Sequence, residues 1–143
     1  MYETIQDAHA TWAYIALFLL ILAVFFALLG YLRKKTFSSN DRLIMLLALV
    51  GMHIQLLIGL ALYFVSPLGL SSLGEMKNAN IRLTSLEHPL INLIALILIT
   101  IGWSKHKKLT ESPAKFRTFT IFYGIGLLLI LNRIPWDLWF QNM

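Results

Sequence analysis

The chain has 143 residues, of which 58% are hydrophobic and only 13% are charged, and its mean hydropathy is +0.72. A soluble domain usually carries about a quarter charged residues, so this composition excludes an ordinary soluble protein. It also argues against nucleic-acid binding, which an isoelectric point near 9.7 would otherwise favour. The absence of cysteine excludes disulfides, thiolate metal sites and c-type haem attachment.

Two long segments, 10–32 and 43–65, contain 23 residues each and no charged residue. About 20 helical residues cross a hydrocarbon core about 30 Å thick, so both segments are long enough to span a membrane. Residues 1–9, which precede the first segment, include Glu3 and Asp7 but no lysine or arginine. A cleavable signal peptide begins with a basic region, so we expect the first helix to stay in the mature protein.

Two shorter uncharged segments follow at 89–103 and 119–131. Each has a basic cluster at one end and a proline or tryptophan at the other, which supports a helix. Pro89 fits the first turn of a helix, and Pro135 fits a helix stop. The sequence predicts a single-domain, all-α, antiparallel up-down bundle of four transmembrane helices, with an outer loop at 66–86 and an interfacial tail at 135–143. The predicted helices lie near 9–32, 42–65, 87–104 and 117–134.

Basic residues give this bundle an orientation. Nine of the 12 lysines and arginines lie in the connections 33–42 and 104–118. The positive-inside rule places these two loops in the cytoplasm and both termini on the opposite side. The simplest explanation of the basic patch is attraction to anionic lipid headgroups. The tail contains Trp136, Trp139 and Phe140, which is typical of an aromatic anchor at the membrane surface.

Small residues mark one face of the first and third predicted helices. Such faces allow helices to pack closely, and each has a histidine at its outer end, His9 or His88. Asn92 lies one turn after His88 on the same face. We expect the two faces to meet and to form a shared site. The face of the first helix comprises His9, Ala13, Ala16, Leu20, Ala23, Ala27 and Gly30, and that of the third comprises His88, Asn92, Ala95, Ile99 and Gly102.

His53 lies near the middle of the second predicted helix, on a face of leucines, and we expect this third histidine also to be buried. Ionisable residues at membrane depth are costly and often functional. One interpretation is a hydrogen bond across the bundle to Asn92 or Tyr123. The other is ligation of haem iron, with the porphyrin covering the leucines. The opposite face carries the small and polar residues Ala48, Gly51, Gln55 and Gly59.

Counting from the basic residue at the cytoplasmic end of each helix, Arg42, Lys105 or Arg33, places His53, His88 and His9 at heights of roughly 17, 26 and 36 Å at 1.5 Å per residue. Neighbouring histidines therefore differ by about 9–10 Å. Two axial haem ligands need similar heights. Helix tilt and extended basic side chains leave both His53 with His88 and His88 with His9 open as pairs.

Two other residues have assigned roles. We expect His106, within a run of lysines, to belong to a solvated basic cluster with no ligand role. Arg133 should lie level with Glu87, so we expect an ion pair that closes the outer end of the bundle. The functional alternative is a contact from Arg133 to a haem propionate or to a quinone.

No motif of a hydrolase, a kinase or a zinc protease occurs in the chain. The scattered Met45, Met52 and Met76 lack the dense spacing that a copper site requires. Four helices are few for a transporter, although a dimer could enclose a path.

Several segments of the chain form a combination that is shared with a known family. They are His9, residues 53–60 with 63–67, Glu87 with His88, residues 99–102 and residues 134–136. Together they resemble a family of small four-helix bacterial inner-membrane proteins labelled cytochrome-b-like. The resemblance covers nearly the whole chain and implies location in the bacterial cytoplasmic membrane. It also implies that His9, His53 and His88 are haem b ligands.

The leading hypothesis is a b-type cytochrome-like protein that moves electrons between a quinol pool and an outer-face acceptor. His53 and His88 are the preferred ligands, with His9 as the alternative ligand or a proton-handling group and Asn92 and Arg133 beside them. The alternative hypothesis is a cofactor-free accessory subunit of a larger respiratory or other membrane complex. A homo-oligomer in the lipid bilayer is compatible with both.

Overall fold

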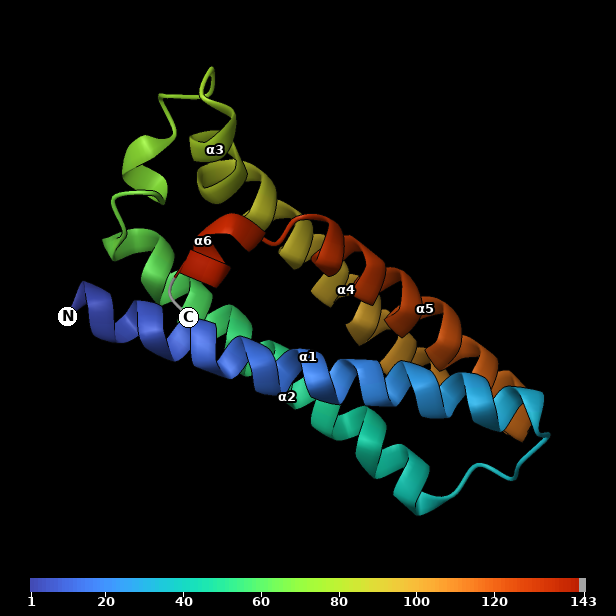
Figure 1. Ribbon diagram of the computed structural model, residues 1–143. Helices are drawn as coiled ribbons and strands as arrows, with labels where there is room; N and C mark the ends of the chain where they lie inside the picture. Colours follow the sequence, from blue (N-terminus) through green and yellow to red (C-terminus); the bar gives the residue numbers. More distant parts are fainter. Residues whose placement is uncertain (142–143) are drawn as a thin grey trace.

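A computed structural model describes residues 1–141 and shows four long helices that pack as an antiparallel bundle (Figure 1). This confirms the predicted all-α architecture. The long helices are α1 (Tyr2–Leu32), α2 (Ser39–Val65), α4 (His88–His106) and α5 (Ser112–Asn132). The shorter elements are η1 (Leu70–Ser72), α3 (Ala79–Arg82), η2 (Leu83–Glu87) and α6 (Trp136–Gln141).

The bundle consists of two helical hairpins (Figure 1). α1 pairs with α2, α4 pairs with α5, and the hairpins meet through α1 with α5 and α2 with α4. The connections 33–38 and 107–111 lie together at one end, which we call the basic end. The connection between α2 and α4 lies at the other end with α6, and we call this the loop end.

The predicted small-residue faces form the centre of the bundle. Ala16, Leu20 and Ala23 of α1 are at most 1% exposed, and Ala95 and Ile99 of α4 are fully buried. This confirms which faces of the first and third predicted helices point inward. Because most positions of these faces carry alanine or glycine, the backbones approach closely, and van der Waals contact holds the helices together.

All four long helical stretches are apolar enough to cross a membrane, with mean hydropathy between 1.5 and 2.9. In the most hydrophobic 18 residues of each stretch, only 28% to 33% of the residues are buried inside the bundle. The outward-facing side chains include Phe18, Leu57 and Leu128, which are more than 60% exposed. An apolar outer surface of this kind is what a lipid-facing bundle presents.

The third span begins earlier than the predicted 87–104, because helical structure runs from Ala79 to His106. Asn78 caps its start, accepting hydrogen bonds from two backbone amides with its side-chain oxygen. Pro89 lies in the first turn of α4, as predicted, but α4 continues directly from a π-helical turn, η2, in which the His88 N–H reaches the Leu83 carbonyl. The predicted outer loop 66–86 is correspondingly shorter.

A hydroxyl compensates for the hydrogen bond that Pro89 cannot make. In a regular α-helix the N–H of residue 89 would donate to the carbonyl of Ser85, but proline has no N–H. Tyr63 of α2 donates its hydroxyl to this Ser85 carbonyl at 2.9 Å. The irregular turn is thus tied to the neighbouring helix.

The first two helices end where the sequence predicts, at Leu32 and Val65, but they begin earlier. α1 begins at Tyr2, α2 begins after a capping box formed by Ser38 and Asp41, and α5 covers 112–132 instead of 117–134. In the predicted tail 135–143, Trp139 of α6 packs against Tyr14 of α1, with ring centres 4.6 Å apart and planes tilted by 38°. Residues 142–143 of that tail lie outside the described residues.

A pair of glycines on α5 tests the packing. A Cβ atom at Gly126 would lie 2.8 Å from Ile99 Cγ1 and 3.2 Å from the Ala95 carbonyl oxygen, whereas at Gly124 its nearest neighbour is Val24 at 4.0 Å. Gly126→Ala should therefore lower the free energy of unfolding in detergent by about 1–3 kcal/mol relative to Gly124→Ala. Denaturant titration followed by circular dichroism measures this difference. Equal stability of the two variants would contradict the packing described.

Candidate functional site

Polar side chains from four segments converge at the loop end of the bundle. We call this group the histidine cluster, and it brings together four of the five residues predicted as a site. Gln55 is the member that sequence reasoning assigned only to a helix face. The cluster comprises His9 of α1, Gln55 of α2, His88 and Asn92 of α4, and Arg133 after α5.

His9 is held from α2. The Gln55 amide nitrogen lies 3.0 Å from the His9 carbonyl oxygen and 3.3 Å from His9 Nδ1. Gly59 leaves room for the ring, because a Cβ at that position would lie 3.1 Å from His9 Cε1. Nδ1 of His9 therefore faces a polar partner on the neighbouring helix, and no described residue hydrogen-bonds to its Nε2.

His88 is held from the end of α5. Its Nδ1 lies 2.8 Å from the Arg133 carbonyl oxygen. Because a carbonyl only accepts hydrogen bonds, the contact with Arg133 requires the proton on Nδ1, and this tautomer leaves Nε2 with its lone pair. Asn92 donates its amide to the His88 carbonyl, and the same nitrogen lies 2.9 Å from Nδ1 and 3.4 Å from Nε2.

The two rings are close neighbours, with centres 6.2 Å apart and planes at 90°. Two imidazoles that bind one metal ion through bonds of about 2.0 Å can have ring centres about 6 Å apart. His88 also has an acceptor at Nδ1, the Arg133 carbonyl, as metal-bound histidines usually do, whereas the Gln55 nitrogen at His9 Nδ1 is a donor. The spacing of the two rings thus fits a pair of imidazole ligands, and the Nδ1 partner fits at His88.

One polar atom of the cluster lacks a partner within residues 1–141. Gln55 Oε1 is buried and accepts no hydrogen bond there. An unpaired buried oxygen is costly. Rotation of the amide by 180° would not remove this cost, because it would turn the oxygen toward the His9 carbonyl oxygen, which the Gln55 nitrogen contacts at 3.0 Å and which can only accept a hydrogen bond.

His53 does not belong to the cluster. Its side chain is exposed on the outside of the bundle, and Nδ1 lies 2.8 Å from the carbonyl oxygen of Leu49 in the same helix. The expectation of a buried His53 is wrong, and so is the hydrogen bond to Asn92 or Tyr123. The reason is that α2 buries Ala48 and Gly51, and residue 53 lies roughly 200° around the helix from Gly51.

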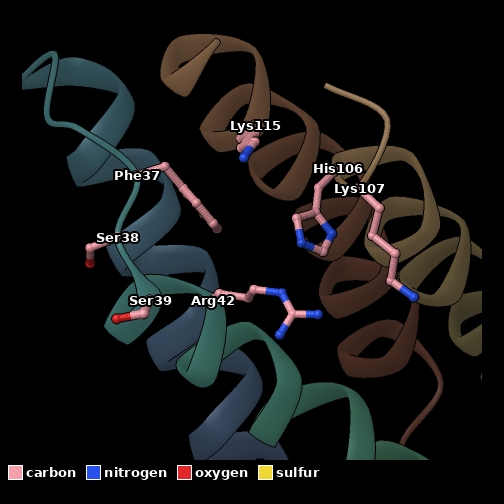
Figure 2. Close-up of a pocket in the computed structure, with 7 residues that line it drawn as sticks. All are labelled: Phe37, Ser38, Ser39, Arg42, His106, Lys107 and Lys115. Atoms are coloured by element: carbon pink, nitrogen blue, oxygen red, sulfur yellow. The ribbon is translucent and has the colours of Figure 1, made fainter. Parts of the chain in front are cut away.

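His106 is also placed differently from its prediction. It is only 2% exposed and lies among aromatic rings, with Trp103 and Phe119 ring centres at 4.5 and 4.7 Å. Its Nδ1 hydrogen-bonds to the Trp103 carbonyl, and the ring lines a basic cavity shown in Figure 2. The neighbouring lysines concealed this in the sequence, although Trp103 one turn earlier was a signal of burial.

Glu87 joins two arginines beside the histidine cluster. Arg133 Nε lies 3.4 Å from one carboxylate oxygen, and Arg82 Nε lies 2.9 Å from the other. The predicted Arg133–Glu87 pair is confirmed. Arg82 was not predicted to take part, because α3 was expected to be loop.

Comparison of the chain with protein-family models, with curated proteins and with solved structures finds no match. Within the described part of the chain, no three histidine, aspartate or glutamate side chains gather in a way that could hold a metal ion. The structure therefore defines a class, a four-helix bundle with four candidate membrane spans and a two-histidine cluster at one end.

The ion pairs of Glu87 should contribute little to stability. Both arginines are 40% exposed and Glu87 is 31% exposed, so water screens the charges. We expect Glu87→Gln to lower the free energy of unfolding by about 0.5–1 kcal/mol, with the difference shrinking in high salt. Glu75→Gln, at an exposed loop residue, is the matched control and should change nothing. A loss from Glu87→Gln that is independent of salt would contradict this account.

Proposed function

We propose that this chain is a membrane-bound, b-type cytochrome-like protein that holds haem between His9 and His88 and takes part in electron transfer. The observation that carries the proposal is the paired rings, 6.2 Å apart, each with a polar partner at Nδ1. The resemblance to the cytochrome-b-like family supports the same function. The sequence left two ligand pairs open and favoured His53 and His88. The pair proposed here is the other one, His9 and His88.

Each residue of the histidine cluster has a role in this proposal. His9 and His88 would hold the iron through Nε2, while Gln55 and the Arg133 carbonyl fix the orientation of their rings. The Arg133 guanidinium, 40% exposed, is placed to pair with a propionate. When bound, haem supplies reversible one-electron chemistry, for which a membrane quinol is a suitable donor.

We further propose that the protein lies in the bacterial cytoplasmic membrane with its basic end in the cytoplasm. The nine basic residues of the two short connections support this orientation through the positive-inside rule. The histidine cluster would then lie near the outer surface, where an electron acceptor outside the cytoplasm can approach it.

A second candidate function has its own observation. His53 is exposed at mid-helix among apolar residues, where contact with lipid is unfavourable. A partner helix that covers His53 would remove this cost. The chain would then be an accessory subunit of a larger membrane complex or a homo-oligomer, and its histidines would be ordinary hydrogen-bonding groups.

An absorption spectrum of the protein purified from haem-replete cells separates the two functions. We expect reduced-haem bands that are lost in His9→Ala and in His88→Ala, because each removes a residue that would hold the iron. His53→Ala is the matched control and should keep the bands, since that ring lies outside the cluster. A colourless preparation, or equal loss in all three variants, would refute the haem proposal.

Cysteine labelling tests the orientation, and the natural chain offers a cysteine-free background. Both Glu75 and Lys108 are exposed at opposite ends of the bundle. We expect a membrane-impermeant maleimide to label Glu75→Cys in cells with a permeabilised outer membrane. Lys108→Cys should react only after the cytoplasmic membrane is disrupted. The reverse pattern would show the opposite orientation.

A further inference from the structure

The basic end contains a cavity of about 370 Å³, within the size range of pockets that bind small ligands. Three different segments contribute its cations. In Figure 2 the guanidinium of Arg42 reaches across from α2 toward His106, at the end of α4. We call this cavity the basic pocket. Its lining comprises Phe37, Ser38, Ser39, Arg42, His106, Lys107 and Lys115.

The three cations of the basic pocket are held by aromatic rings. Arg42 lies 4.8 Å and Lys107 5.5 Å from the centre of the Trp103 ring, and Lys115 lies 5.3 Å from that of Phe37. Trp103 itself is only 7% exposed, so it provides a fixed surface. Cation–π contact positions a charge without neutralising it.

No carboxylate neutralises these charges within residues 1–141. The described ion pairs use Asp41 and Glu87, neither of which pairs with Arg42, Lys107 or Lys115. Asp41 is instead occupied by Lys35 and by the Ser38 cap of α2. Three cations around one cavity repel one another, and an anion inside the cavity would relieve this repulsion.

The walls of the basic pocket are well fixed. Phe37 donates its backbone N–H to the Ser112 hydroxyl at 2.9 Å, which joins the α1–α2 connection to the start of α5. Its ring stacks on that of Phe119, with centres 5.9 Å apart. His106 is buried behind them. A preformed site loses little conformational entropy when a ligand binds.

We infer that the basic pocket binds a phosphate group. Phosphate presents several strong acceptor oxygens, so it can meet cations that approach from three segments, whereas a carboxylate has only two. The pocket lies where three candidate spans end, near His106, Ser112 and Ser39. That is the level of lipid headgroups, and basic pockets between helices on the cytoplasmic side bind such groups. A soluble phosphate reaches the same level from water.

Binding to the delipidated full-length protein in detergent tests this inference. Native mass spectrometry would follow phosphatidylglycerol, with phosphatidylcholine as the zwitterionic comparison, and calorimetry would follow inorganic phosphate. The variant Arg42→Gln with Lys107→Gln should weaken binding of phosphatidylglycerol at least about tenfold. The control is Lys34→Gln with Lys108→Gln, which removes the same charge from the same end at residues that do not line the pocket and should change binding less than about twofold, because solvent screens their charges.

The two probes distinguish the source of the phosphate. If the pocket variant weakens only the binding of phosphatidylglycerol, and the control does not, the pocket binds a lipid headgroup. If the pocket variant weakens saturable binding of inorganic phosphate, and the control does not, the pocket binds a soluble ligand. Equal weakening by the two double variants, or no binding of either probe, overturns the inference. Should the double variant fail to fold, Lys115→Gln against the exposed Arg117→Gln gives the same comparison, with at least about threefold weakening expected.

Discussion

Close packing of the small-residue faces of α1 and α4 against their neighbouring helices is the interaction on which this structure depends. Both α1 and α4 pack mainly on α2 and α5, so the expectation that their two faces meet does not hold along the helices. Lipid is as apolar as leucine, so burial of hydrophobic surface cannot drive helices together inside a membrane, and dense packing has to do so. Gly30 illustrates the closeness, because a Cβ there would lie 2.5 Å from the Phe116 ring. The same faces decide where polar groups gather. The inward face of α1 runs from His9 to Gly30, and that of α4 from His88 to Gly102, so the two histidines meet at the end where both faces stop at a polar residue.

The π-helical turn before α4 links packing to the histidine cluster. A π turn contains one residue more than an α turn and therefore rotates everything before it relative to the helix that follows. In η2 this lets Ser85 point its carbonyl at the Tyr63 hydroxyl while His88 faces the bundle. Glu87, the last residue of the turn, is then free to reach Arg82 and Arg133. One irregularity thus supports both the ring pair and the ion pairs beside it.

Local patterns predicted those parts of the structure that depend on a single helix. The inward faces of α1 and α4 follow from residue spacing alone, and the level of Arg133 with Glu87 follows from counting along two adjacent helices. On α2, His53 was misjudged because polar residues lie on two faces of the helix, and spacing cannot tell whether neighbours cover both of them. His106 was misjudged because adjacent lysines indicated water, whereas the deciding contacts come from Phe37 and Phe119 on other segments.

The height calculation shows why counting residues could not select the histidine pair. It placed His9 and His88 about 10 Å apart along the membrane normal, yet their ring centres are 6.2 Å apart in space. The calculation treats each basic residue as a marker of one common level. Lys105, the marker for His88, instead folds back along the bundle, with its ammonium 5.8 Å from the centre of the Phe122 ring. Arg42, the marker for His53, lines a cavity between helices. Basic residues that interact with aromatic rings are poor depth markers, so only contacts between helices determine which histidines meet.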